Sequence, residues 1–128
     1  YQAYTFASTY IENLGQGNFT LHQLPQFAQL SSVNALVIED VNQDGNLDIV
    51  LAGNMYGSEV ETARNDASLG LVLLGNGEGN FTPLSLAESG LLAPGDVKSM
   101  MKLNQADGGT LVLVGNNDDS LQVFALQD

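Results

Sequence analysis

The stretch VIEDVNQDGNLDIVLAGN, residues 37–54, decides how the rest of the sequence is interpreted. It places a polar segment, residues 40–48, between two apolar runs that have the composition of β-strands. Oxygen-bearing side chains occupy every second position of that segment, and Gly45 stands where the chain must turn sharply. Such alternation points successive side chains toward one centre, as in a loop that binds calcium. The candidate ligands are Asp40, Asn42, Asp44, Asn46 and Asp48.

Two interpretations of residues 40–48 compete. Asn, Asp and Gly also dominate ordinary turns that hold no metal. However, three carboxylates within this short segment repel one another unless a cation lies among them. The oxygen donors suit calcium, which takes about 6–8 oxygen ligands, better than zinc or copper. An EF-hand carries Glu at its twelfth position, where this chain has Leu51, so we expect Asp48 to coordinate directly, together with the backbone carbonyl of Asn46.

The whole chain is acidic, which limits its partners. Among 128 residues there are 15 Asp and Glu against 3 Lys and Arg, a formal net charge of -12. This charge disfavours nucleic acid and anionic membrane surfaces and favours cations. The absence of Cys excludes disulfides, thiol catalysis and cysteine-based zinc sites. The length is sufficient for one modest domain with its own core.

The ends of the chain and its apolar runs bear on targeting. No apolar run approaches the roughly 18 residues that span a bilayer, so we expect no membrane insertion. The chain opens on Tyr1 rather than Met and carries no signal-peptide pattern. We therefore expect a piece of a longer or processed protein.

Two copies of one pattern run through the chain. YIENLGQGNFT at residues 10–20 aligns with VLLGNGEGNFT at residues 72–82, an offset of 62. The same offset aligns IVLAGN at residues 49–54 with LVLVGN at residues 111–116. Because one offset joins two separate matches, we interpret the pattern as an internal repeat.

The register of the repeat changes after Asn54. SLGLVLL at residues 68–74 aligns with SLQVFAL at residues 120–126 at an offset of only 52, so residues 55–67 form a longer loop in the first copy. Binding functions concentrate on loops, although a solvated turn explains this polar segment equally well. Its charged residues are Glu59, Glu61, Arg64 and Asp66.

Within the repeat, short segments rich in Val, Ile, Leu, Phe and Thr alternate with Gly, Asn and Asp clusters, which is typical of strands and tight turns. No long window shows the 3.6-residue apolar period of a helix, so we expect an all-β fold. LDIVLA and LVLLG are apolar on both faces, which indicates sheets covered on both sides. Four strands per unit predict the four-stranded antiparallel blades of a β-propeller. The strands are expected near residues 5–13, 18–24, 33–40, 47–53, 68–75, 80–86, 97–103, 110–115 and 120–126.

These strands do not complete a ring of blades. Residues 1–32 match the last two strands of a preceding blade, residues 33–90 form a complete blade with the calcium loop, and residues 91–128 form part of a following blade. A propeller needs about 4–8 blades to close. We therefore expect a fragment of a larger propeller, whose partners are neighbouring blades or further copies of the chain.

The loop in the second copy lacks the ligand set. At the offset of 62 it reads KLNQADGGT, residues 102–110, and it puts Lys102, Ala106 and Thr110 in place of the three carboxylates. An ammonium at the first ligand position repels a cation. We therefore predict that this loop binds no metal and that the chain has one calcium site.

These features together resemble one family of repeats. D-x-N-x-D-G-x-x-D between two strands, followed by LVLLGNGEGNF, is similar to the FG-GAP/VCBS repeat of integrin alpha-subunit propellers and many bacterial surface proteins. The closing SGLLAPGDVKSMMKL and LVLVGNNDDSLQVF resemble the last blade of bacterial VCBS-repeat proteins, including those carrying an ASPIC/UnbV module. The resemblance implies a seven-bladed, calcium-stabilised propeller that is exported. It also implies an extracellular, cell-surface or periplasmic location and a role in adhesion or ligand presentation.

No residues in the sequence indicate catalysis. His22 is the only histidine, and without Cys or a partnered base we expect it to be an ordinary strand residue. We predict a non-enzymatic calcium-binding repeat module for extracellular adhesion, scaffolding or binding of a protein or carbohydrate ligand. The alternative is an accessory or structural part of a carbohydrate-active enzyme whose catalytic residues lie outside this chain or in residues 55–67.

Overall fold

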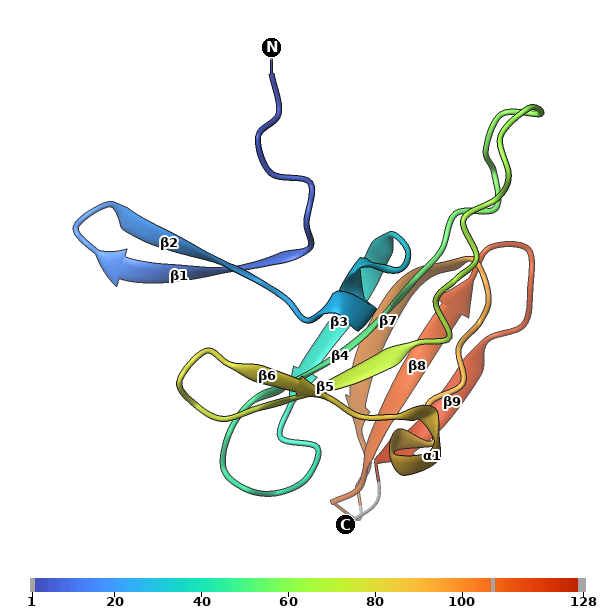
Figure 1. The fold of residues 1–128 in the computed structure, drawn as a ribbon. Helices are drawn as coiled ribbons and strands as arrows, with labels where there is room; N and C mark the ends of the chain where they lie inside the picture. Colours follow the sequence, from blue (N-terminus) through green and yellow to red (C-terminus); the bar gives the residue numbers. More distant parts are fainter. Residues whose placement is uncertain (1, 107, 127–128) are drawn as a thin grey trace.

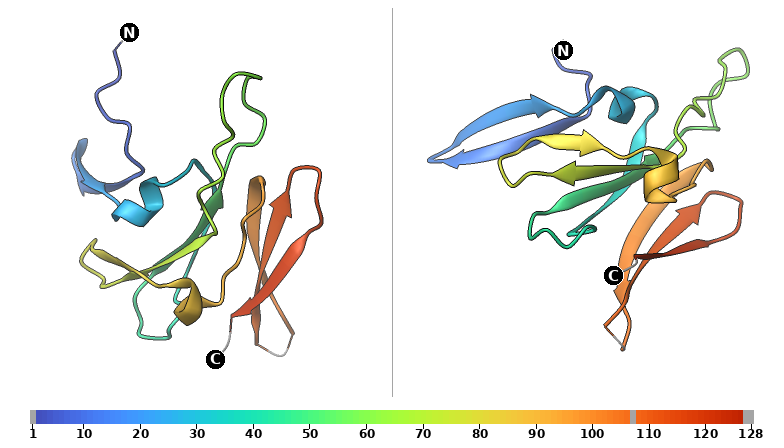
Figure 2. Two further views of the ribbon diagram at one scale, coloured as in Figure 1. Left: turned by 45° about the vertical axis from the view of Figure 1, so that its right-hand side comes forward. Right: turned by 60° about the horizontal axis from the view of Figure 1, so that its bottom comes forward.

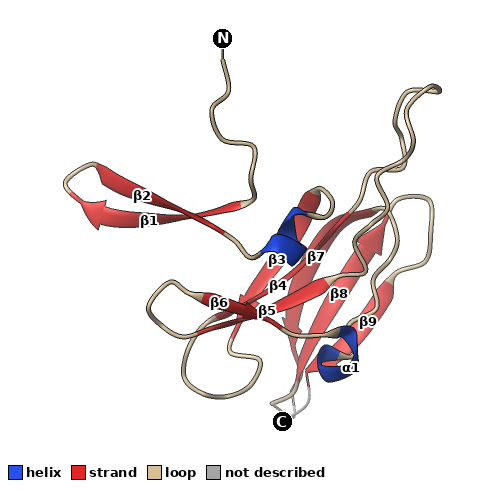
Figure 3. Ribbon diagram, in the orientation of Figure 1, coloured by secondary structure: helices blue, strands red, loops and turns tan. Residues whose placement is uncertain are grey.

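A computed structural model describes residues 2–106 and 108–126 of the chain. The described residues form three open antiparallel sheets and very little helix, which confirms the predicted all-β fold (Figure 1; Figure 3). The two-stranded sheet consists of β1 (Thr9–Gly15) and β2 (Asn18–Gln23). The four-stranded sheet has the order β3 (Val33–Glu39), β4 (Asp48–Gly53), β5 (Leu71–Gly75) and β6 (Phe81–Pro83). The three-stranded sheet has the order β7 (Val97–Asn104), β8 (Thr110–Asn116) and β9 (Gln122–Leu126).

Each expected strand has a counterpart, but three boundaries differ from the prediction by more than two residues. The first strand begins at Thr9 rather than residue 5 and continues to Gly15, where the chain turns with a positive φ of 84°. The fifth begins at Leu71, because the N–H of Ser68 donates to the Asn54 side chain instead of to a neighbouring strand. The sixth ends at Pro83. The three sheets lie one after another along the chain (Figure 2).

A short helix replaces the expected end of the sixth strand. Ser85 caps α1 (Leu86–Ser89): its hydroxyl oxygen accepts the N–H of Glu88 at 3.3 Å, and the Glu88 carboxylate accepts the N–H of Ser85 at 2.8 Å. This reciprocal pair is a capping box, and Gly90 ends the helix with a φ of 65°. The other helical turn is η1 (Gln26–Gln29). In the described part of the chain, neither is long and apolar enough to cross a membrane.

The central sheet is covered on both faces, as the apolar runs in its sequence predict. One face of β4 and β5 packs with the three-stranded sheet around Val50, Val72 and Val114. The opposite face packs with η1 around Leu51 and Leu73. The strands β4 and β5 therefore lie between two apolar cores.

Asn54 joins the central sheet to the three-stranded sheet. It is completely buried and has a φ of 100°. Its side-chain amide donates to the carbonyl oxygens of Ser68, Pro94 and Gly95 at 2.9–3.1 Å, and its Oδ1 accepts the N–H of Ser68. Asn34 adds a bond from its own amide to the Asn54 carbonyl oxygen at 2.6 Å. One side chain thus fixes the end of β4, the approach to β5 and the approach to β7.

In β8 the observed strand pairing differs by one residue from the alignment of the two repeat copies at an offset of 62. Both β3–β4 and β7–β8 carry a β-bulge at the start of their first strand. At the bulge Val33 pairs with Gly53 and Val97 pairs with Asn116, whereas the offset of 62 puts Gly115 in the place of Gly53. A shift of one residue moves every side chain to the opposite face of a sheet, so the offset of 62 does not relate the faces of β8 to those of β4.

Candidate metal centre

The β3–β4 loop, residues 40–47, forms an open turn at the edge of the central sheet (Figure 1). Two residues reverse the chain with positive φ angles, Gln43 at 58° and Gly45 at 88°. Glycine adopts this conformation without steric cost, which explains its place in the sequence pattern. The loop is thereby shaped so that alternate side chains can turn toward its own backbone.

The Asp40 carboxylate, at the start of the loop, binds the backbone at the turn of the loop. Its Oδ1 accepts the N–H of Asp44 at 3.1 Å and its Oδ2 accepts the N–H of Gly45 at 2.9 Å. The N–H of Asp44 also lies 3.2 Å from Oδ1 of Asn42, whose amide donates to Oδ2 of Asp44 at 3.0 Å. The structure therefore brings three of the five predicted ligands, Asp40, Asn42 and Asp44, into one hydrogen-bonded group.

The environment of Asp44 favours its charged form. The backbone N–H of Asn46, at 2.8 Å from Oδ1, is the main cause that lowers the pKa of this carboxyl below 3.8, and the Asn42 amide adds to it. Hydrogen bonds donated to a carboxylate stabilise its ionised state. Asp44 is therefore an anionic donor at neutral pH.

Asp48 lies beneath the loop and is completely buried. Its Oδ2 accepts the N–H of Val41 at 2.8 Å, and its Oδ1 accepts the N–H of Gly75, at the end of β5, also at 2.8 Å. A Cβ at Gly75 would collide with the carbonyl oxygen of Leu47, so glycine permits this close approach. Asp48 thus ties the loop to the third strand of the sheet.

The side chain of Asn46 extends from the β3–β4 loop to the neighbouring β5–β6 turn. Its Oδ1 is 2.5 Å from the position that a Cβ on Gly77 would occupy, so its side chain reaches the β5–β6 turn. Its backbone N–H remains bound to Asp44. The Asn46 side chain is thus directed toward this turn. The backbone carbonyl of Asn46 is the oxygen that the sequence pattern predicts as a ligand.

The carboxylates of the candidate site lack a cationic side-chain partner in the described part of the chain. Among the described residues, no Lys, Arg or His side chain forms an ion pair with Asp40, Asp44 or Asp48. Each carboxylate oxygen has two lone pairs, so one N–H contact leaves room for a second partner. No three His, Cys, Asp or Glu side chains converge as a metal-binding group within residues 2–106 and 108–126. A cation here would therefore need the amide and backbone oxygens as well as the carboxylates.

The equivalent loop of the three-stranded sheet is shorter than the sequence alignment implies. Lys102 lies inside β7, where it pairs with Val112, and its ammonium forms an ion pair with Glu39. Lys102 therefore does not occupy the first position of a loop, and the alignment of Lys102 with Asp40 is wrong. Beyond β7, the N–H of Gln105 donates to the carbonyl oxygen of Gly109 at 2.7 Å.

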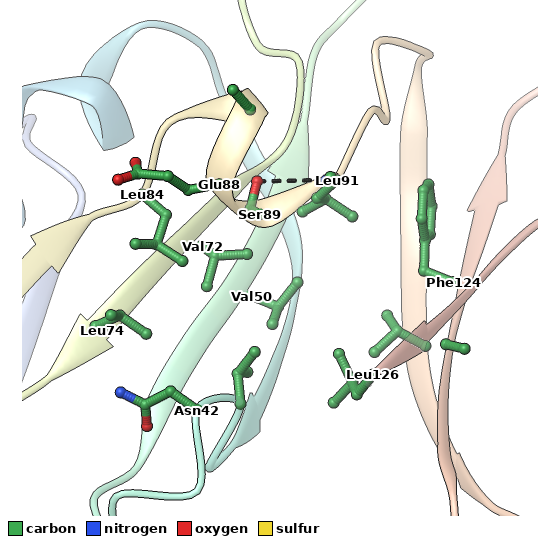
Figure 4. A pocket seen from close by; sticks show the side chains of 15 residues that line it. Asn42, Val50, Val72, Leu74, Leu84, Glu88, Ser89, Leu91, Phe124 and Leu126 are labelled. Carbon is green, nitrogen blue, oxygen red and sulfur yellow. Dashed lines mark hydrogen bonds between the residues drawn. The ribbon is translucent and has the colours of Figure 1, made fainter. Parts of the chain in front are cut away.

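The other candidate sites contain no catalytic arrangement among the described residues. His22 lies in β2, 3.0 Å from the Glu12 carboxylate and stacked on Tyr10, with no nucleophile in contact. A cavity of about 550 Å³ between the central and three-stranded sheets is lined mainly by aliphatic side chains (Figure 4). Among the described residues that line it, Glu88 is the only titratable one, and the Ser85 hydroxyl donates to its carboxylate at 2.6 Å.

Sequence reasoning missed two residues that position the site. Gly75 supplies the N–H that fixes Asp48, but it appeared in the sequence only as the last residue of an expected strand. Asn54 appeared only as the last residue of the repeated IVLAGN pattern. The recurrence of this residue as Asn116 was the one signal that could have indicated a structural role.

Comparisons with known proteins gave no match: no family model, no curated protein and no solved structure is similar to this chain.

Proposed function

We propose that the chain is a non-enzymatic calcium-binding module, made of FG-GAP/VCBS-type propeller blades, that acts in extracellular, cell-surface or periplasmic adhesion, scaffolding or ligand binding. The observation that carries the proposal is the β3–β4 loop, where three carboxylates lack a cationic partner among the described residues. The loop conformation supports the same proposal, since positive φ angles at Gln43 and Gly45 reverse the chain. Hydrogen bonds then join Asp40, Asn42 and Asp44 in one group.

Calcium in this loop would bind hard oxygen donors only. Asp40, Asn42 and Asp44 would supply side-chain oxygens, Asn46 its backbone carbonyl, and Asp48 a lone pair from beneath the loop. The ion would neutralise the carboxylates and hold the β3–β4 turn in one conformation. Because Asp48 is also bound to Gly75 in β5, that rigidity would extend into the central sheet.

The arrangement of the sheets supports the blade assignment. Counted from their β-bulges, Leu51 in β4 and Val114 in β8 hold the same register position. Leu51 packs on η1, and Val114 packs on the central sheet, so each sheet turns the same face toward the segment that precedes it in the chain. Repeated packing of this kind is typical of blades around an axis.

A thermal melt in calcium and in chelator tests the metal site. A ligand that binds only the folded state adds RT ln(1 + [L]/Kd), about 2.7 kcal/mol at 100-fold over Kd, so Tm should rise with calcium. Asp44→Ala should abolish this response, because it removes an exposed carboxylate of the loop. Glu78→Gln, in the β5–β6 turn, removes a charge outside the ligand set and should leave the response intact.

Two results would contradict the metal assignment. A Tm that is the same in calcium and chelator would make residues 40–48 an ordinary acidic turn. A response that Asp44→Ala and Glu78→Gln reduce equally would show that calcium acts through net charge rather than through the loop.

A further inference from the structure

The connection between β4 and β5 is much longer than the fold requires. It comprises residues 54–70, whereas β8 and β9 are joined by residues 117–121. Both connections join neighbouring antiparallel strands of a sheet. Loops longer than about 12–15 residues are uncommon in compact domains and are usually functional. The extra length therefore calls for a role other than chain reversal.

The base of this long loop is firmly attached to the molecule. Met55 and Asn65 exchange two backbone hydrogen bonds, at 2.8 and 2.9 Å. The hydroxyl of Ser31 donates to the side chain of Asn65 at 2.8 Å, and the hydroxyl of Tyr56 donates to the carbonyl of Pro94 at 2.8 Å. The loop is thus bound to both larger sheets and projects away from them (Figure 1; Figure 2).

The only cation of the loop is already paired. Arg64 donates from Nε to Asp66 at 2.8 Å, and its guanidinium lies 4.4 Å from the centre of the Tyr56 ring. These contacts stiffen the stem and neutralise its charge. The unpaired charges of the loop are therefore the two carboxylates nearest the tip, Glu59 and Glu61.

The tip presents one apolar side chain between these carboxylates. The N–H of Thr62 donates to the carbonyl of Glu59 at 2.9 Å, and the hydroxyl of Ser58 donates to the carbonyl of Thr62 at 2.9 Å, which closes a defined turn. At the centre of the turn Val60 is 105% exposed, the highest value among the exposed large hydrophobic residues. A branched apolar residue held in water by a hydrogen-bonded turn gains free energy only if another surface covers it.

We propose that residues 55–67 form a recognition loop that inserts Val60 into an apolar pocket of a partner protein, with lysine or arginine side chains on the rim of that pocket. Burial of Val60 would supply affinity, and Glu59 and Glu61 would pair with the basic rim. The net charge of -12 would attract such a partner from a distance. Because the loop is structured before binding, little conformational entropy would be lost. The inference deepens the proposed function by naming a kind of ligand. It does not rest on the metal site, because the hydrogen bonds that the structure describes for residues 55–67 involve none of residues 40–48.

The test is a selection of binders from a displayed library of small folded domains with randomised surfaces. Selection on the natural chain is followed by counter-selection on a variant whose tip, residues 57–63, is replaced by the two-residue turn Asn-Gly, which retains the Tyr56–Arg64 stem. The surviving binders should carry an apolar pocket rimmed by Lys and Arg. All steps are run both in calcium and in chelator. If the selected binders behave alike in the two conditions, the recognition loop acts independently of the metal site.

Point variants then assign the binding energy. Val60→Ser should weaken binding about 10- to 100-fold, mainly through faster dissociation, since burying a valine is worth roughly one to two factors of ten. Glu59→Gln with Glu61→Gln should slow association and reduce its dependence on salt, the effect expected of rim charges. Leu121→Ser, at another exposed apolar residue, and Glu78→Gln are the matched controls and should change neither rate.

Three results would overturn the proposal: no binder survives counter-selection, the survivors show no excess of basic residues, or Val60→Ser binds as tightly as the natural chain. If the shortened variant does not fold, the selection is done on the natural chain against Val60→Ser, which alters only an exposed side chain. In that case the first two outcomes overturn the proposal, because a binder that survives this counter-selection cannot bind Val60→Ser tightly.

Discussion

Asp48 shows how one residue can have a structural role at a candidate ligand position. Its carboxylate is buried, and it is held by backbone donors from the loop and from β5. A buried carboxylate is tolerated when hydrogen bonds satisfy it, and it becomes costly when they are removed. The residue should therefore stabilise the fold even without a metal, unlike the exposed carboxylate of Asp44.

Asp48→Ala should destabilise the chain in chelator as well as in calcium. The substitution leaves the N–H groups of Val41 and Gly75 without an acceptor, at a cost of at least about 2 kcal/mol. Urea denaturation measures the loss, with Asp44→Ala as the exposed control that should lose much less in chelator. If Asp48→Ala were neutral in chelator, the residue would act only as a ligand.

The stability of the chain should fall in acid through two exposed carboxyls. The N–H of Asn46 and the Asn42 amide lower the pKa of Asp44, and the hydroxyl and N–H of Ser85 lower the pKa of Glu88. A pKa lowered in the folded state adds stability that is present above the unfolded value, near pH 4, and is lost as pH falls through the lower folded value.

Asp44→Asn and Glu88→Gln should each reduce this loss. The urea midpoint measured from pH 6 to pH 2 should decline less steeply in either variant, and least in the double variant. An unchanged pH profile in the double variant would show that other groups cause the acid sensitivity.

At the scale of the elements, Asn54 connects strands that are far apart in the sequence. It links the end of β4 to residue 68 before β5 and to residues 94 and 95 before β7. Its positive φ lets the amide point inward instead of along the strand. Asn116 is the corresponding residue of the sequence repeat, and its amide donates to the Ser120 carbonyl and the Gln122 side chain, near its own sheet.

Asn54→Ala should therefore cost about 3 kcal/mol or more, because it removes several buried hydrogen bonds and places alanine at an unfavourable φ. Asn54→Gly should recover only the backbone part, about 1 kcal/mol. Asn116→Ala is the control and should cost less. Chemical denaturation gives these values, and faster amide exchange at the start of β7 should accompany the loss. If Asn54→Gly were as stable as the natural chain, the side-chain network would be unimportant.

At the scale of the whole molecule, the sheet surfaces at both ends are apolar and uncovered. On the three-stranded sheet Met101, Leu103 and Val123 are about half exposed, and on β2 so are Phe19 and Leu21. An exposed patch of this kind on a monomer commonly marks an interaction surface. These surfaces support the proposal that neighbouring blades, or copies of this chain, cover the sheets.

The isolated chain should self-associate as its concentration rises. Met101→Lys with Val123→Lys should shift its mass toward the monomer, because the two ammonium groups cannot be buried in an apolar contact. Light scattering after size exclusion measures this mass over a range of concentrations, with Val60→Lys as a control at an exposed residue outside the two end sheets. A mass that is concentration-independent in the natural chain would contradict self-association.

Local patterning was sufficient to locate the strands but not to relate them to one another. LDIVLA and LVLLG predicted strands covered on both faces, and β4 and β5 are. The same patterning failed at residues 84–86, where the capping pair of Ser85 and Glu88 outweighs apolar content. The loop donors from Asp40 to Asp48 were evident in the sequence, but the second-copy loop was misaligned because β7 extends to Asn104.

The sequence by itself determined the strand pattern, the turn at Gly45 and the oxygen-rich composition of the β3–β4 loop, because each depends on residues within a few positions of one another. Only the tertiary structure decided that Asp48 binds Gly75, that Asn54 reaches Pro94, and that Val114 rather than Leu113 faces the central sheet. These outcomes depend on register and on contacts between distant segments, and a one-residue shift, which barely changes a local pattern, reverses every face.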